Sequence, residues 1–373
     1  MRDVFLYGTL RHAPLLAIVL GETPPGQQAA RLSGHAVRAV AGAPYPALVP
    51  APGESAEGIL LRDQGPRALG RLCHYEAAFG YAAAPVTVET DAGPKPAQVF
   101  LPDVPPETDG PWSLGDWQAA WGRLSEEAAR EVMAHHGRLS PGAIGDIFGM
   151  IRSRAHSRVL GATPRPRAPI VASADRGSVE LLAHRRPYAS YFAMEEQDLR
   201  FPLFGGGYSE AVTRAALVAT DAALVVPYDP RRDEVLLIEQ FRPGPYLRGD
   251  PRPWCLEPVA GRVDPGEAPE TTARREAEEE AGVTLERLET ISRSYPSPGC
   301  STEFFYIYLG LADLSRPPAE TGGLEEEAED IRRHVLPLEQ VVEWADAGLL
   351  DVGPLELSVH WLARHRDRLR TAG

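Results

Sequence analysis

The chain has 373 residues, and its 43% hydrophobic and 24% charged content is ordinary for a globular protein with a sizeable core. At roughly 100–200 residues per domain, this length predicts two or three domains. The 38 Lys and Arg residues against 52 Asp and Glu residues give a net charge of −14, which argues against a nucleic-acid partner. The longest early apolar run, residues 15–20, is far shorter than the roughly 20 residues of a membrane span, so no membrane partner is expected.

Cysteine usage and the N-terminus indicate the cellular compartment. The 3 cysteines, Cys73, Cys255 and Cys300, are too few and too scattered for a disulfide framework or a zinc site. An odd number of cysteines suits the reducing cytoplasm. The N-terminus has no basic region followed by an apolar run, so we expect no secretory signal and a cytoplasmic protein.

The front of the chain, residues 1–110, is rich in Ala, Pro and Gly. Apolar runs at residues 4–7 and 97–101 predict buried strands, and proline and glycine separate the remaining short runs. This pattern indicates a compact β-rich domain with few helices.

Residues 111–165 are expected to form a helical connector and linker. Apolar residues recur near helical spacing over residues 117–136. Ser140 followed by Pro141 is typical of a helix start, and that helix is expected to run to about residue 160. A proline-rich stretch then predicts the linker between two domains.

The remaining residues, 166–373, alternate strands with single long helices, which predicts an α/β sandwich. Strands are expected over residues 179–183, 216–226, 234–239 and 302–309. Helices are expected over residues 269–281 and 358–369.

The first of these helices carries a dense set of acids. Pro269 suits its first turn, and Gly282 suits its end. Glu276, Glu279 and Glu280 stand at i, i+3 and i+4, so their carboxylates share one face. Three like charges there destabilise the helix unless cations neutralise them, and hard oxygen ligands suit Mg²⁺ or Mn²⁺. A solvated acidic face is the alternative for such a run taken by itself.

The spacing around these acids resembles that of a known family. Residues 261–283 match GX5EX7REUXEEXGU, where U is aliphatic, and this pattern resembles the Nudix box. Ala277 is the weakest match if U must be bulky. Residues 225–242, ending in Glu-Gln-Phe-Arg, and residues 253–261 resemble the ADP-ribose pyrophosphatase branch, as does the acidic stretch 323–331.

The resemblance implies a divalent-metal site. Glu276 and Glu280 are the expected main ligands, together with the carbonyl oxygen of Ala260. Glu329 corresponds to an additional ligand of the branch. The expected cofactor is therefore Mg²⁺, with Mn²⁺ as an alternative, bridging and polarising a pyrophosphate.

The resemblance also implies catalytic and substrate-binding residues. Glu327 is the expected general base, and Glu279 is the alternative. Arg242 is expected to contact the substrate phosphates, and Arg214 the adenosine part. Three further substrate-binding residues are implied by their motifs: Glu257, Ser297 and Gly299.

The front of the chain resembles a second family. Phe5 to Arg11 include Tyr7-Gly8-Thr9-Leu10, which resembles the opening of the γ-glutamylcyclotransferase-like (AIG2-like) family. In that turn, backbone N–H groups and a hydroxyl hold a carboxylate or an oxyanion. Glu76 is the implied acid/base for attack of an amine on a γ-carbonyl, although Cys73 stands where the family has Asp. A barrel kept for binding or dimerisation is the alternative.

Together these patterns predict two domains: a γ-glutamylcyclotransferase-like β-barrel of the α+β class and a Nudix α/β/α sandwich. The fused arrangement resembles tellurite-resistance-type fusion proteins. The resemblance implies Mg²⁺-dependent hydrolysis of ADP-ribose to AMP and ribose 5-phosphate. The alternatives are another nucleoside diphosphate sugar, such as GDP-mannose, and γ-glutamyl cyclotransferase activity at the front. A homodimer through the Nudix part is expected.

Overall fold

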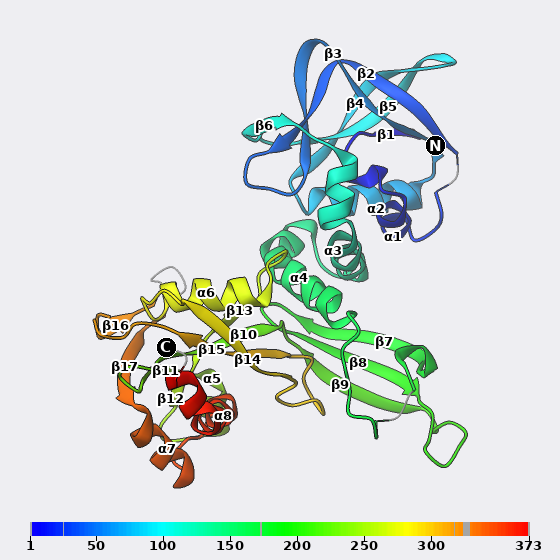
Figure 1. Cartoon of the computed structure of the whole chain (residues 1–373). Helices are drawn as coiled ribbons and strands as arrows, with labels where there is room; N and C mark the ends of the chain where they lie inside the picture. The colour runs from blue at the N-terminus through cyan, green and yellow to red at the C-terminus, as the bar shows by residue number, and fades with distance from the viewer. Residues whose placement is uncertain (1, 25, 172–173, 317, 324–328, 372–373) are drawn as a thin grey trace. The chain divides into compact units, whose positions relative to one another are not determined.

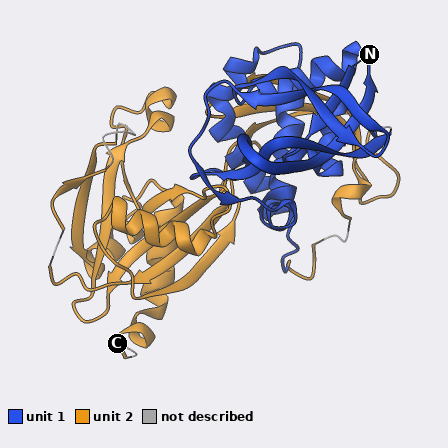
Figure 2. Cartoon of the chain, turned by 90° about the horizontal axis from the view of Figure 1, so that it is seen from above, with its two compact units in different colours: residues 1–166 blue, residues 167–373 orange. Residues whose placement is uncertain are grey.

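A computed structural model describes residues 2–24, 26–171, 174–316, 318–323 and 329–371. The chain divides into two compact units, residues 1–166 and 167–373, which Figure 2 shows in different colours. Figure 1 labels the helices and strands of both. Within the described ranges, no helix combines the length and the apolar character that a bilayer crossing requires.

Unit 1 contains a closed barrel of antiparallel strands with one parallel pair. The strands pair in the order β3-β1-β5-β4-β2, and β2 also pairs with β3, which closes the ring. β1 and β5 are the parallel pair, and the short strand β6 (Thr108–Pro111) extends from β2. The barrel strands are β1 (Arg2–Leu6), β2 (Gln27–Val40), β3 (Pro46–Gln64), β4 (Tyr81–Thr90) and β5 (Gly93–Pro102).

Strand β1 is buried on both faces because successive side chains point to opposite sides. Phe5 and Tyr7 pack inside the barrel, whereas Val4 and Leu6 pack against the helices of the unit. Gly58 of β3 allows β1 to come this close, since a Cβ there would lie 2.4 Å from the Leu6 carbonyl oxygen. The strand therefore brings residues 7–10 to the border between barrel and helices.

Four helices complete unit 1: α1 (Ala13–Leu20), α2 (Pro66–Ala77), α3 (Leu114–Ala134) and α4 (Pro141–Gly161). The predicted start of α4 is present, because the Ser140 hydroxyl accepts a hydrogen bond from the Ala143 N–H at 3.2 Å. Trp117 of α3 and Ile144 of α4 share one core with β1 and α1. The helices predicted as a connector thus pack into unit 1, whose boundary lies at residue 166.

Unit 2 is built on a mixed sheet in the order β14-β15-β10-β11-β17-β16, with β13 added to β10 and β12 added to β11. Strands β10 and β11 pair only next to their turn and then separate, so β12 and β13 take up the freed edges. The strands are β10 (Ala222–Asp229), β11 (Glu234–Phe241), β12 (Trp254–Glu257), β13 (Val259–Arg262), β14 (Arg287–Ser294), β15 (Phe305–Leu311), β16 (Thr321–Gly322) and β17 (Ile331–Pro337).

Helices cover this sheet on both sides, as the sandwich prediction requires (Figure 1). Helix α6 (Pro269–Glu279) contacts β10 and β13. On the other side, α7 (Leu338–Asp346) and α8 (Gly353–Thr371) form an apolar core with Val226, Leu237 and Leu309. The short helix α5 (Pro243–Arg248) follows β11.

The strand predicted over residues 216–226 is wrong, because two strands of different sheets occupy this range. Strand β9 (Val212–Val218) belongs to a three-stranded sheet with β7 (Glu180–Ala189) and β8 (Ala193–Arg200), whereas β10 begins at Ala222. At the junction the Thr302 hydroxyl bonds to both the N–H and the carbonyl of Ala219, each at 3.1 Å. The side chain of Thr302 there replaces a strand partner, and the polar residues Thr220 and Asp221 mark the break in the sequence.

Candidate functional site

The acidic helix α6 is held by small buried residues. Pro269 stands in its first turn, and beyond its end Gly282 adopts a left-handed φ of 68°. Ala273 and Ala277 are fully buried, so the helix backbone approaches the sheet closely. The small side chain of Ala277, the weakest match to the box, therefore suits the packing.

Arg275 neutralises part of the acidic surface and fixes its geometry. Its Nη1 lies 2.7 Å from Glu276 and 2.9 Å from Glu279, and its Nη2 lies 3.3 Å from Glu267. The Thr272 hydroxyl also donates to Glu267 at 2.6 Å. One guanidinium thus binds three carboxylates, which orders them before any ligand arrives.

The two most buried acids of the helix point toward strand β13. Glu280 is 3% exposed, and its Oε2 accepts a hydrogen bond from the Ala260 N–H at 3.0 Å. Burial raises the pKa of Glu276 to about 7, although Arg275 opposes the shift, and the pKa of Glu280 to about 8. The charge of Glu329 raises both pKa values further.

This donor set fits a hard divalent cation. Glu276, Glu280 and Glu329 are carboxylates whose mutual repulsion a cation would relieve. Gly261 leaves room for them, since a Cβ at this position would lie 1.8 Å from Glu276 Oε1. Among the residues with described positions, no three His, Cys, Asp or Glu side chains already converge on one point. The chain therefore presents ligands that a cation would draw together.

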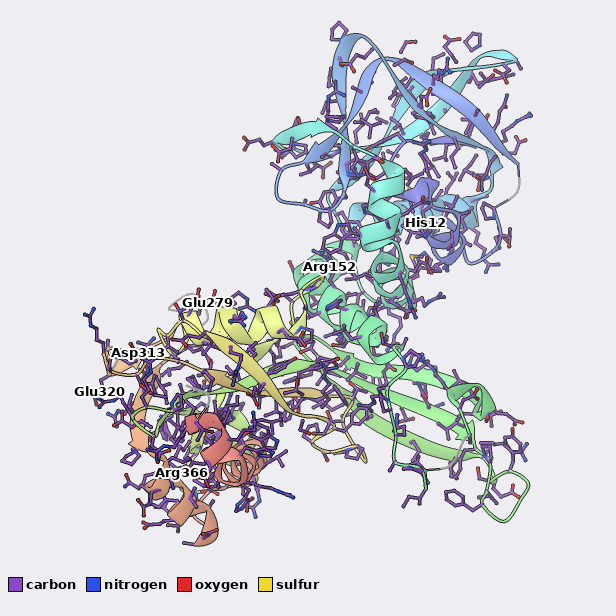
Figure 3. The ribbon with its side chains drawn as sticks, viewed as in Figure 1. His12, Arg152, Glu279, Asp313, Glu320 and Arg366 are labelled. Atoms are coloured by element: carbon purple, nitrogen blue, oxygen red, sulfur yellow. The ribbon has the colours of Figure 1, made fainter. Side chains whose placement is uncertain are left out.

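A cavity of about 420 Å³ opens beside these acids and is lined by most of the residues that the sequence predicts for the site. Arg242 stands at its edge, with Nε 2.8 Å from Glu257 Oε2. Glu257 is buried, which raises its carboxyl pKa despite Arg242. The predicted residues in the lining are Arg242, Glu257, Ala260, Glu276, Glu279, Glu280 and Glu329. Figure 3 marks Glu279 on its helix.

Gly323 and Glu329 lie close together in the structure. A Cβ on Gly323, whose φ is 102°, would lie 2.8 Å from the Glu329 carbonyl oxygen. The ends of the stretch between these two residues therefore touch. Glu327 falls within that stretch, outside the described residues, and its predicted role has no structural description.

Three predicted substrate-binding residues lie elsewhere in unit 2. Arg214 is an exposed residue of β9, and its Nη1 donates to the Thr213 carbonyl at 3.0 Å. Ser297 and Gly299 belong to the loop after β14, and neither lines the cavity. The carbonyl of Cys300 in that loop accepts from the Leu217 N–H at 2.8 Å. These residues are thus grouped with the three-stranded sheet.

The cavity also contains residues that the sequence reasoning missed. Glu303 lines it, and burial raises its carboxyl pKa while Arg242 lowers it. Tyr191 and Phe192 add aromatic rings in edge contact, with centroids 4.8 Å apart. None belongs to a recognisable spacing: Glu303 is a lone acid before a strand, and the aromatic pair lies in a turn between strands.

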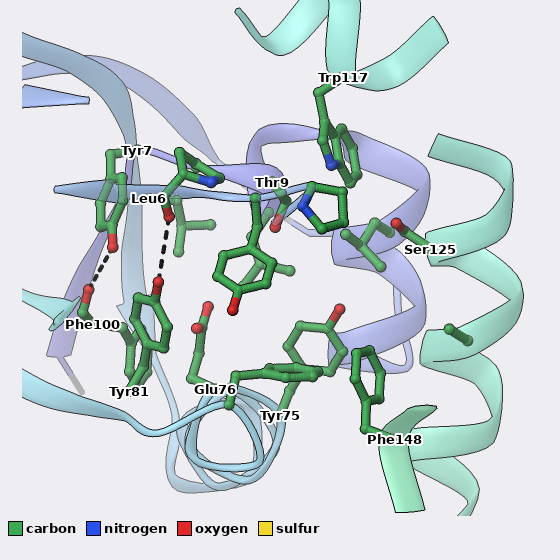
Figure 4. Close-up of a pocket in the computed structure, with 18 of the residues that line it drawn as sticks. Leu6, Tyr7, Thr9, Tyr75, Glu76, Tyr81, Phe100, Trp117, Ser125 and Phe148 are labelled. Atoms are coloured by element: carbon green, nitrogen blue, oxygen red, sulfur yellow. Dashed lines mark hydrogen bonds between the residues drawn. The ribbon is translucent and has the colours of Figure 1, made fainter. Parts of the chain in front are cut away.

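Unit 1 has a separate pocket of about 120 Å³, and all five residues predicted there line it: Tyr7, Gly8, Thr9, Leu10 and Glu76. Figure 4 shows the Glu76 carboxyl reaching into this pocket. Burial raises its pKa to about 8. The Tyr7 hydroxyl donates to the Phe100 carbonyl at 3.0 Å. Cys73, which stands where the family has Asp, is exposed and does not line the pocket.

Comparisons with known proteins agree with both resemblances. A family profile described as NUDIX domain matches residues 218–352, and one described as Gamma-glutamyl cyclotransferase, AIG2-like, matches residues 4–119. An ADP-ribose pyrophosphatase of Escherichia coli (strain K12) is 37% identical over 195 residues, which are 52% of this chain and 92% of that protein.

Two other relatives cover the same part of the chain. An ADP-ribose pyrophosphatase of Haemophilus influenzae is 37% identical over 194 residues, covering 52% of this chain and 89% of that protein. A GDP-mannose pyrophosphatase of Enterobacter sp. (strain 638) is 32% identical over 143 residues, covering 38% of this chain and 73% of that protein. The names of these relatives therefore include both candidate substrates, ADP-ribose and GDP-mannose.

A side chain added at Gly261 would fill the space beside Glu276, and this change tests the cation site. We expect Gly261→Ala to weaken Mn²⁺ binding by about 10–100-fold, because its Cβ displaces the Glu276 carboxylate. Isothermal titration of the full chain with Mn²⁺ measures this. Gly205→Ala is the matched control, since a Cβ there meets nothing within 4 Å. Equal Mn²⁺ affinity of the two variants would contradict the assignment.

Proposed function

This chain belongs to the Nudix family of hydrolases, and we propose that its substrate is ADP-ribose, which it hydrolyses to AMP and ribose 5-phosphate. The observation that carries the proposal is the cavity that is lined both by the acids of α6 and by Arg242. An acidic wall binds a pyrophosphate only when cations lie between the two, and an arginine in the same cavity supplies further positive charge. We further propose a cytoplasmic location.

Different residues of the chain have different roles in the proposed reaction. Glu276, Glu280, Glu329 and the Ala260 carbonyl would hold Mg²⁺ or Mn²⁺, which when bound polarises the phosphoryl oxygens and the attacking water. Arg242, which the buried Glu257 holds through a hydrogen bond, would bind a phosphate oxygen and keep the pyrophosphate of the substrate in position.

A carboxylate must take one proton from the attacking water. As the new P–O bond forms, the bridging P–O bond breaks, and the leaving phosphate accepts a proton from solvent. We assign the base to Glu327, two residues before Glu329 of the cavity wall. The Oε2 atom of Glu279, the alternative, is engaged by Arg275 at 2.9 Å, which supports this choice.

The proposal of ADP-ribose in preference to GDP-mannose is based on the sequence identity to the relatives. Identity to the ADP-ribose pyrophosphatases is 37% over about half of this chain, against 32% over a shorter stretch for the GDP-mannose enzyme. Phe192 offers an aromatic ring in the cavity lining for a nucleobase, and stacking of this kind accepts either purine. GDP-mannose is therefore the substrate to compare directly.

We also propose a homodimer formed through unit 2. The three-stranded sheet exposes large apolar side chains, among them Leu181 at 57%, Leu182 at 53% and Tyr188 at 60%. A second copy would remove these from water. In such a dimer the sheet of one copy would carry Arg214, and the loop containing Ser297 and Gly299, toward the cavity of the other.

A second candidate function concerns unit 1, and a specific observation favours it. Glu76 is a buried carboxyl in the pocket formed by Tyr7 to Leu10, and no hydrogen bond to its side chain is found among the described residues. We propose γ-glutamyl cyclotransferase activity: Glu76 takes a proton from the attacking α-amine and returns it to the departing amine, as the γ-carbonyl closes into 5-oxoproline. A binding role without catalysis is the alternative.

Removing one carboxylate from α6 tests the primary proposal. We expect Glu280→Gln to lower kcat/KM for ADP-ribose by more than about 100-fold, because a cation ligand is lost. Release of phosphatase-sensitive phosphate measures turnover, with GDP-mannose in parallel. Glu278→Gln is the control on the same helix, since that side chain is exposed and outside the cavity. Near-normal turnover of Glu280→Gln, or faster hydrolysis of GDP-mannose, would contradict the proposal.

The roles of Glu329 and Glu327 separate in a metal titration. Glu329→Gln should lose activity that excess Mg²⁺ or Mn²⁺ partly restores, because it lowers cation affinity. Glu327→Gln should lose about 10²–10⁴-fold in turnover that no cation concentration restores, because the proton acceptor is missing. Turnover of both variants is measured against Mg²⁺ and Mn²⁺. If metal restored the activity of Glu327→Gln, the general base would have to be Glu279 or another residue.

Charges placed on the three-stranded sheet test the dimer. We expect the Leu181→Glu, Tyr188→Glu double variant to sediment as a monomer where the unaltered chain sediments as a dimer, and to lose ADP-ribose hydrolysis. Sedimentation velocity and the phosphate assay measure the two effects. Leu349→Glu, at a side chain 68% exposed outside that sheet, should stay dimeric and active. A monomeric, active unaltered chain would refute the dimer.

A further inference from the structure

The C-terminal end of α6 presents backbone carbonyl groups that need donors from outside the helix. Two are satisfied locally, because the N–H groups of Gly282 and Val283 donate to carbonyl oxygens four and six residues earlier, at 3.1 and 3.0 Å. The carbonyl groups of Glu279 and Glu280 come next along the chain. Glu280 also carries a carboxylate of the proposed cation site, so a contact that fixes this end of the helix also fixes part of the site.

Arg333 of β17 supplies donors to both of these carbonyl groups. Its Nε lies 2.6 Å from the Glu280 carbonyl oxygen, and its Nη2 lies 3.4 Å from that of Glu279. The half-buried arginine therefore caps α6, and a positive charge at the C-terminal end of a helix is favourable. The spacing of the acids does not indicate this contact, because Arg333 lies far beyond residues 261–283.

The same guanidinium also binds the backbone at β16. Its Nη1 lies 3.3 Å from the Ala319 carbonyl oxygen and 3.2 Å from that of Thr321. Thr321 begins β16, which pairs antiparallel with β17, the strand of Arg333 itself. One side chain thus joins the end of α6 to the β16–β17 pair. Figure 3 labels a residue on each side of this connection, Glu279 of α6 and Glu320 directly before β16.

The proposed cation site takes its ligands from both of the elements that Arg333 joins. Glu276 and Glu280 stand at the end of α6, Glu329 stands two residues before β17, and all three line the same cavity. A cation bound by carboxylates from both elements requires a fixed distance between them. The four bonds of Arg333 described above use backbone oxygens, so they leave these carboxylates to the cation.

We propose that Arg333 is a positioning residue of the cation site: it holds the β16–β17 pair against the end of α6, so that Glu329 and Glu280 bind the same cation. This role rests on the cation-dependent hydrolysis proposed above. Arginine suits it because a planar guanidinium carries five donors in a fixed fork, which reaches carbonyl groups on two elements at once. A lysine carries its donors on a single nitrogen and would bridge the two elements less well.

Mn²⁺ binding, measured by isothermal titration of the full chain, tests this role independently of turnover. We expect Arg333→Met to weaken Mn²⁺ binding by about 10–100-fold, as the loss of a residue that orients metal ligands does. Arg333→Lys should have an affinity between that of Arg333→Met and that of the unaltered chain. In a chain that already carries Glu329→Gln, Arg333→Met should weaken binding by less than about threefold, because the ligand that it positions is absent.

Two further variants separate position from charge. Gly322→Ala keeps Arg333, but its Cβ would overlap the guanidinium, so we expect it to weaken Mn²⁺ binding as Arg333→Met does. Arg332→Met is the matched control: it removes the same charge from the neighbouring position of β17, where the side chain is 57% exposed and points to the other face of the sheet. Arg332→Met should keep the Mn²⁺ affinity of the unaltered chain. Thermal melting shows whether each variant is folded.

The outcomes separate the role of Arg333 from the function on which it rests. Unchanged Mn²⁺ affinity of Arg333→Met at a lower melting temperature would make Arg333 a stabilising residue only and overturn the proposal, as would equal losses of affinity with and without Glu329. If Arg333→Met does not fold, Gly322→Ala and Arg333→Lys decide by the same measurement. An unaltered chain that binds Mn²⁺ without hydrolysing ADP-ribose would contradict the proposed substrate and leave the role of Arg333 intact. A chain that binds no Mn²⁺ would overturn the cation site and the role of Arg333 together.

Discussion

The approach of α6 to strand β13 is the contact on which unit 2 depends. It places the carboxylates of Glu276 and Glu280 against a backbone that has no side chain at Gly261 and that donates a hydrogen bond from Ala260. Carboxylates buried this way are costly when charged, so the site is built to gain from a cation. Arg275 limits the cost, and the buried alanines of the helix make the approach possible.

Both units place a buried carboxyl in a cavity, but they surround it differently. In unit 2 several acids crowd together with Arg275 and Arg242 beside them, an arrangement suited to a polyanion carried with metal ions. In unit 1 a single acid, Glu76, stands among phenols. A lone carboxyl with a raised pKa exchanges protons near neutral pH, which suits acid/base work on an uncharged carbonyl. The two units thus place the same buried group in different chemical surroundings.

Sequence alone predicted the parts of the structure that local rules determine. The Ser140 cap and the acidic helix ending before Gly282 follow from caps and spacing, and the structure contains both. The break between β9 and β10 was missed although Thr220 and Asp221 interrupt the apolar run, because a distant side chain, Thr302, supplies the hydrogen bonds that stabilise it. Glu303 was missed for a related reason: it reaches the cavity through tertiary packing and belongs to no motif. Arg214 and Ser297 do not line the cavity of their own chain, so their predicted roles require the proposed dimer.

The contact between Gly323 and Glu329 has a consequence for the chain lengths that unit 2 can accommodate. Because the two ends of the intervening stretch already meet, the fold fixes where the stretch leaves and returns, independently of what lies between. Doubling the length of such a closed segment costs only about 0.6 kcal/mol in chain entropy. Insertions, deletions and exchanges there would leave the sheet and α6 unchanged. A stretch of a different length that keeps the base assigned to Glu327 can therefore be accommodated without rebuilding the rest of unit 2.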